Sequence, residues 1–102
     1  MIRKNINTPN IKFSRRFDKQ LSDAPDEIIE AFLETLALFL ENPHNPTLRN
    51  HALKENYAGL RSIDVTEDWR VVFRQTRSGK RKIITFHMLG THKKLYRQYF
   101  SH

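Results

Sequence analysis

Cysteine is absent from the sequence, which excludes disulfide bonds and thiolate metal sites. Long hydrophobic runs are absent as well, since no stretch reaches the roughly 18 apolar residues that a membrane-spanning helix needs. The basic N-terminus lacks the apolar segment of a signal peptide. These absences favour a cytoplasmic protein. The 102 residues suffice for one domain, residues 1–102, but not for two.

Acidic residues are scarce, because 11 Asp and Glu stand against 18 Lys and Arg. Several of the acidic residues fall in one segment, 26–41, so the other segments are more basic than the average. A formal net charge of +7 on a small surface favours an anionic partner, either a nucleic acid or an acidic protein.

Apolar periodicity predicts two helices in the first half of the chain. Ser14 is a suitable N-cap for a first helix that runs through Phe17 to Leu21. Pro25 suits the first turn of a second helix, and Asn42 before Pro43 ends it. The side chains predicted to form its inward stripe are Ile29, Phe32, Leu33, Leu36, Phe39 and Leu40.

Strand-like segments occupy the rest of the chain, at residues 51–54, 59–65, 69–75 and 82–89, after a short one at 10–13. Residues 66–68 and 77–80 are predicted hairpin loops, and Gly79 permits the positive φ that such a turn requires. Residues 92–99 are predicted to form a short C-terminal helix or turn. The fold class is therefore α+β, with two N-terminal helices packed on one face of a small antiparallel sheet.

Polar side chains that can exchange protons fall near the ends of the predicted strands. They are His51, Asp64, Asp68, His87, His92 and Tyr96. Cleavage of RNA by its own 2′-hydroxyl needs a base for that proton, an acid for the departing 5′-oxygen, and positive charge for the phosphate. Two histidines, or a histidine and a carboxylate, supply the first two, and Lys54, Arg61 or Arg70 supplies the charge. No metal or other cofactor is needed.

Other roles for the same residues stay open. A single histidine is more often a surface or core residue than a catalytic one, and the five-residue spacing of His87 and His92 matches no established metal-ligand pattern. Trp69 and Tyr96 could each stack on an unpaired RNA base or pack in the core. Arg61 and Arg70 could each pair with a carboxylate of the sheet or hold a phosphate.

Four motifs suggest a family. They are His51-x-Leu53, Gly59-Leu60-Arg61-Ser62, Asp68-Trp69-Arg70-Val71-Val72-Phe73 and Gly90-Thr91-His92-x-x-Leu95-Tyr96. Over nearly the whole chain, the sequence resembles the RelE/ParE superfamily of bacterial toxins and is most similar to its YafQ-like branch. This resemblance implies a RelE-like fold and a type II toxin–antitoxin system. It also implies a ribosome-dependent endonuclease that cuts mRNA in the ribosomal A site and an acidic antitoxin that silences it.

The resemblance also implies roles for individual residues. His51 matches a catalytic-site histidine, and His92 matches the principal histidine of the branch. Asp68 matches a functional aspartate, Trp69 the tryptophan beside it, and Tyr96 an aromatic residue that is often phenylalanine. The toxin is expected to be a monomer when free.

Two positions depart from the pattern of the branch. Asp64 stands where a second histidine is expected, and Met88, beside His87, stands where an arginine that stabilises the phosphate is expected. The candidates to replace that arginine are Lys54, Arg61, Lys93 and Lys94. These departures keep two rival functions in view, a ParE-like inhibitor of DNA gyrase and a basic binding module without catalytic activity. Histidines at positions 51 and 92 favour the nuclease.

Overall fold

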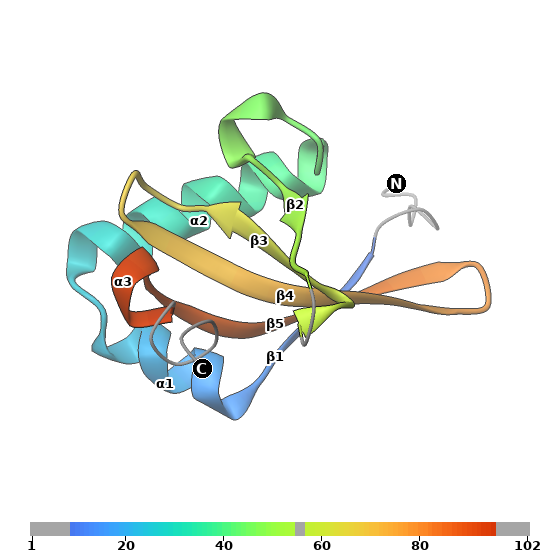
Figure 1. The fold of residues 1–102 in the computed structure, drawn as a ribbon, viewed down its shortest axis with the longest axis horizontal. Coiled ribbons are helices and arrows are strands. Elements are labelled where there is room, and N and C mark those ends of the chain that lie inside the picture. Colours follow the sequence, from blue (N-terminus) through green and yellow to red (C-terminus); the bar gives the residue numbers. More distant parts are fainter. Residues whose placement is uncertain (1–8, 55–56, 96–102) are drawn as a thin grey trace, which may run out of the picture.

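The computed structural model describes residues 9–54 and 57–95. Within them the elements follow in the order β1 (Asn10–Phe13), α1 (Arg15–Asp23), α2 (Asp26–Glu41), η1 (Pro46–Leu48), β2 (His51–Ala52), β3 (Leu60–Asp64), β4 (Trp69–Ser78), β5 (Arg81–Thr91) and α3 (His92–Leu95) (Figure 1). None of the helices in these two stretches is long and apolar enough to span a membrane. The predicted site residue Tyr96 lies outside the described residues.

The five strands form one sheet in the order β1-β5-β4-β3-β2. Strands β2 to β5 pair in antiparallel fashion, as the sequence predicts. Strand β1 runs parallel to β5, so the sheet is mixed and not wholly antiparallel. A parallel pair requires a long connection, and both helices and three strands separate β1 from β5 along the chain.

Helices α1 and α2 build the main core against one face of the sheet. Phe17 of α1 lies 5.6 Å from Phe86 of β5 between ring centroids, and Phe39 of α2 lies 5.2 Å from Phe73 of β4. Ring pairs at such distances add to the stabilisation that burial alone provides. The α+β class and the helix-covered sheet face are confirmed.

Local signals at the helix ends act as predicted. The Ser14 hydroxyl accepts a hydrogen bond of 3.0 Å from the Phe17 backbone N–H, which caps α1. The same hydroxyl donates to the His87 carbonyl at 2.8 Å, which ties the start of α1 to β5. The exception is Pro25, because helix α2 begins directly after it, which makes this proline the N-cap residue and not part of the first turn as predicted.

The predicted inward stripe of α2 is partly wrong. Leu33 and Leu40 are 56% and 43% exposed, whereas Ile28, which the prediction omitted, is buried. The buried positions of α2 are Ile28, Phe32, Thr35 and Phe39. This spacing of three or four residues keeps one face of the helix inward, and Leu33 and Leu40 each follow a buried position by one residue, which turns them about 100° away.

A second, smaller apolar cluster lies on the opposite face of the sheet. It contains Val72 of β4, Met88 of β5 and Leu95 of α3. Strand alternation separates this cluster from the main core, since Val72 lies between the main-core residues Val71 and Phe73 on β4. A β-bulge also interrupts the pairing with β5, because Val72 pairs with Met88 but Phe73 pairs with Phe86, so that His87 has no partner on β4. Through Leu95, the short helix α3 covers part of the sheet face that α1 and α2 leave open.

Candidate active site

A surface cavity of about 360 Å³ lies on the sheet face opposite α1 and α2. Its described lining residues are His51, Ala52, Leu53, Lys54, Tyr57, Ser62, Arg70, Val72, His92 and Leu95. Val72 and Leu95 belong to the smaller apolar cluster, so they form an apolar floor under polar walls. The structure thus brings together residues from β2, the segment after it, β3, β4 and α3.

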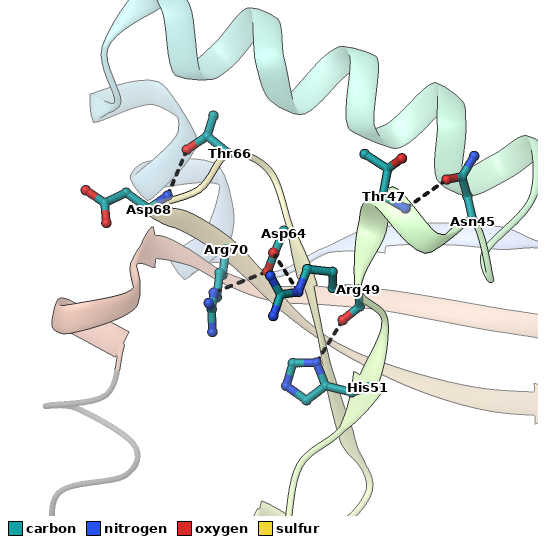
Figure 2. Close-up of polar contacts among 8 residues, drawn as sticks. All are labelled: Asn45, Thr47, Arg49, His51, Asp64, Thr66, Asp68 and Arg70. Atoms are coloured by element: carbon teal, nitrogen blue, oxygen red, sulfur yellow. Dashed lines mark hydrogen bonds and ion pairs between the residues drawn. The ribbon is translucent and has the colours of Figure 1, made fainter.

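His51 is held in a defined orientation at the start of β2. Its Nδ1 lies 2.8 Å from the Arg49 carbonyl oxygen (Figure 2). A carbonyl can only accept a hydrogen bond, so Nδ1 carries the proton and Nε2 of the neutral ring carries the lone pair. Arg49 itself has a left-handed backbone (φ 50°) at the end of η1, and this turn presents its carbonyl to the ring. The arrangement leaves His51 suited to accept a proton at Nε2.

His92 is placed by the junction between β5 and α3. Its backbone N–H donates to the Asp68 carbonyl at 2.7 Å, which fixes the start of α3 against the β3–β4 loop. Close packing at Gly90 helps, because a Cβ added there would lie 3.3 Å from two carbons of the Leu95 side chain. His51 and His92 are distant in the chain but line the same cavity, as the sequence predicts.

Arg70 adds positive charge to the cavity wall. It pairs in register with Asp64 across β3 and β4, and its Nε lies 3.2 Å from Asp64 Oδ1. The Nε–H is not aligned with a hydrogen-bond acceptor among the described residues, so the contact is an ion pair. Asp64 Oδ2 lies 3.7 Å from Arg49 Nε (Figure 2). Lys54, which also lines the cavity, is exposed.

Three residues that the sequence proposed for the site lie elsewhere. Trp69 packs against the main core on the helix-covered face, which is the alternative to base stacking. Arg61 shares that face with Ile63 by strand alternation, and its Nε–H donates to Asn50 Oδ1 at 2.8 Å. Asp68 is exposed, does not line the cavity, and points its carboxylate away from the Asp64 carboxylate (Figure 2).

His87 also lies outside the cavity lining. As the unpaired residue of the bulge it is half-buried. Burial, and then the positive charges of Arg74 and Arg16, lower the pKa of His87 from its usual value of 6.5. The bulge explains the misplacement, because an extra residue changes the face to which the following side chains point and leaves no signal in the sequence.

The remaining predicted residues lie near the cavity without lining it. Lys93 and Lys94 are exposed on α3, and Asp64 contacts the cavity only through Arg70. Sequence reasoning missed Tyr57 and Ser62 in the lining and the part that Arg49 plays. A left-handed residue is usually signalled by glycine or asparagine, and Arg49 is neither. Among the described residues, no group of three or more His, Asp or Glu is arranged to hold a metal ion.

Comparison with known proteins identifies the family. Residues 9–97 match the family described as the bacterial toxin of type II toxin–antitoxin system, YafQ. No curated protein sequence matches the chain.

Solved structures share the fold. YafQ from E. coli is 22% identical, with a TM-score of 0.71 over 86% of this chain and 98% of that one. YafQ in the E. coli DinJ–YafQ complex is 20% identical, with a TM-score of 0.70 over 87% of this chain and 98% of that one. The archaeal RelE–RelB complex from Pyrococcus horikoshii matches at 21% identity, with a TM-score of 0.63 over 82% of this chain and 94% of that one. The chain belongs to the YafQ family of bacterial toxins of type II toxin–antitoxin systems.

Proposed function

We propose that this toxin is a ribosome-dependent mRNA endonuclease that cuts RNA through its 2′-hydroxyl without a metal. The observation that carries the proposal is that one cavity is lined by His51, His92, Arg70 and Lys54. A pair of imidazoles can serve as base and acid near neutral pH, and the two cations can stabilise the charge that develops on the phosphate.

The hydrogen bond at His51 supports a role for this residue as the base, and we build the order of proton transfer on it. With Nδ1 bound to the Arg49 carbonyl, Nε2 of His51 takes the proton from the 2′-hydroxyl. The 2′-oxygen then attacks the adjacent phosphorus and forms a 2′,3′-cyclic phosphate, while the bond from phosphorus to the 5′-oxygen breaks. His92, protonated, gives its proton to that departing oxygen. Asp68 is not assigned a part in these steps, because it does not line the cavity.

The β4–β5 hairpin supports contact with ribosomal RNA. Its outer part carries five cations and no acidic residue, namely Arg74, Arg77, Lys80, Arg81 and Lys82. The hairpin extends away from the body of the molecule (Figure 1). Arg77 and Lys82 lie directly opposite each other, and like charges in such positions destabilise a sheet. An RNA phosphate between or beside them would relieve this repulsion.

An acidic antitoxin is the proposed protein partner. Two of the similar structures are complexes, the E. coli DinJ–YafQ toxin–antitoxin complex and the RelE–RelB complex from Pyrococcus horikoshii. With a net charge of +7, this chain favours an antitoxin segment that is acidic and that either lies on the basic surface or adds a strand to a sheet edge. Strand β2, with two residues at one edge, offers such a position.

The decisive variant is His92→Gln, compared with wild type in a translation reaction and mapped by primer extension on the mRNA. Loss of one general acid should slow cleavage by about 100-fold or more. The control is His44→Gln, since His44 is an exposed histidine in the turn after α2, outside the cavity. Cleavage by His92→Gln at the wild-type rate would refute the assigned role. Arrest of DNA replication by the wild type, without mRNA cuts, would replace the proposal with gyrase inhibition.

A further inference from the structure

Asp64 occupies a position that suits a structural role for its charge. Both of its carboxylate oxygens face guanidinium groups, Oδ1 toward Arg70 at 3.2 Å and Oδ2 toward Arg49 at 3.7 Å. The two arginines reach it from different elements, one from β4 and one from the end of η1 (Figure 2). Asp64 does not line the cavity in which we place the scissile phosphate.

The two ion pairs differ in how strongly they are shielded from solvent. The Asp64 and Arg70 side chains are only 13% and 24% exposed, whereas the Arg49 side chain is 75% exposed. An exposed pair contributes little, while removal of one partner of a shielded pair leaves the other charge without compensation. The Asp64–Arg70 contact is therefore the one that determines the local geometry.

We propose that Asp64 is a positioning residue, not an acid or base of the reaction, and that it fixes Arg70 as the cation that holds the scissile phosphate. This inference rests on the proposed function. An arginine has five N–H donors, so Arg70 can keep its Nε side against Asp64 and direct its terminal N–H groups to a phosphate in the cavity.

The neighbouring strand explains why the cation sits at position 70. Met88 is fully buried and pairs with Val72, so an apolar side chain occupies the position at which the resemblance leads one to expect an arginine. Arg70 lies two residues from Val72 and therefore shares its face of the sheet, where it lines the cavity. Its partner in register on β3 is Asp64, so the arginine and the carboxylate that compensates it form one cross-strand unit.

The coupling between Asp64 and Arg70 can be measured without cleavage. The probe is a 2′-O-methyl RNA trinucleotide, which cannot react, and its affinity is followed by fluorescence anisotropy. Loss of a charge-assisted hydrogen bond to the phosphate in Arg70→Gln should weaken binding about tenfold. Asp64→Asn should weaken it to a similar degree, and the double variant should bind no more weakly than Arg70→Gln alone.

The matched control is Asp23→Asn. Asp23 also forms an ion pair at 3.2 Å, with Lys19, but this pair lies on the exposed surface of α1. It should bind the probe as the wild type does. Unchanged binding by Asp64→Asn, or an equal loss from this change in the presence and absence of Arg70, would overturn the inference. Should Asp64→Asn fail to fold, Arg70→Lys serves instead. Lysine keeps the charge but lacks the planar guanidinium whose Nε side can lie against the carboxylate while its terminal N–H groups hold a phosphate, so wild-type affinity for that variant would overturn the inference too.

A second readout separates positioning from proton transfer. If Asp64 only positions Arg70, the pH–rate profile of cleavage by Asp64→Asn should keep both limbs at a reduced rate. Disappearance of one limb would show that Asp64 itself gives or takes a proton. If the wild type cleaves no RNA at all, the proposed function fails, yet the binding comparison still decides whether Asp64 and Arg70 act as one unit.

Discussion

Replacing Arg77 by threonine should have opposite effects on stability and on RNA binding. Arg77 is exposed and lies opposite Lys82 in the β4–β5 hairpin, so the wild type contains a repulsive cross-strand pair. Removing a like-charge pair should raise the free energy of unfolding by about 0.5 kcal/mol, and threonine also favours a strand. For a domain of this size, that gain corresponds to a rise in Tm of roughly 2–4 °C.

The same change should weaken binding to ribosomes. Each phosphate contact that is lost reduces the slope of log affinity against log salt concentration by roughly 0.7–0.9. The assay is a salt series of binding to programmed ribosomes, with a non-cleaving His92→Gln background in both proteins, together with thermal melts monitored by circular dichroism.

The stability control is Lys12→Thr. Lys12 is an exposed strand cation that faces the uncharged Thr85 in register, so its removal relieves no such pair. A lower Tm for Arg77→Thr would refute the repulsion argument. A salt slope equal to that of the background protein would show that the hairpin does not contact RNA.

Two further predictions concern His87 and the contact beneath it. Because burial and the charges of Arg74 and Arg16 lower the folded-state pKa of His87, the unfolded chain binds the proton more readily. The contribution of neutral His87 to stability is therefore complete above pH 6.5 and falls as the pH drops below that value. The free energy of unfolding, measured by urea titration on either side of pH 6.5, should depend less on pH in His87→Gln than in the wild type. An equal dependence in both proteins would contradict the lowered pKa. Replacing Ser14 by alanine removes the cap on Phe17 and the bond to the His87 carbonyl, and should cost about 1–2 kcal/mol by urea denaturation. An aspartate can cap the helix but cannot donate the bond to the His87 carbonyl, so Ser14→Asp should recover only part of the lost free energy of unfolding. An unchanged free energy of unfolding in Ser14→Ala would refute both contributions.

The sequence by itself determined the elements of this protein, because their signals are local. Ser14 begins one helix, Asn42 before Pro43 ends the next, and Gly79 adopts the positive φ (62°) of the hairpin turn. The motifs around Asp68 and His92 were also sufficient to indicate the family, since they occur at fixed positions in the chain. None of these conclusions requires knowledge of which distant side chains meet.

Tertiary structure alone decided which side chains share the cavity. Successive strand residues face opposite sides of a sheet, so the neighbours Trp69 and Arg70 separate, one into the main core and the other into the cavity wall. The bulge at His87 and the left-handed turn at Arg49 then determine where the imidazoles point. A local pattern cannot reveal such features, because a bulge is defined by the pairing of two strands and the orientation of His51 by a carbonyl that only the folded turn presents.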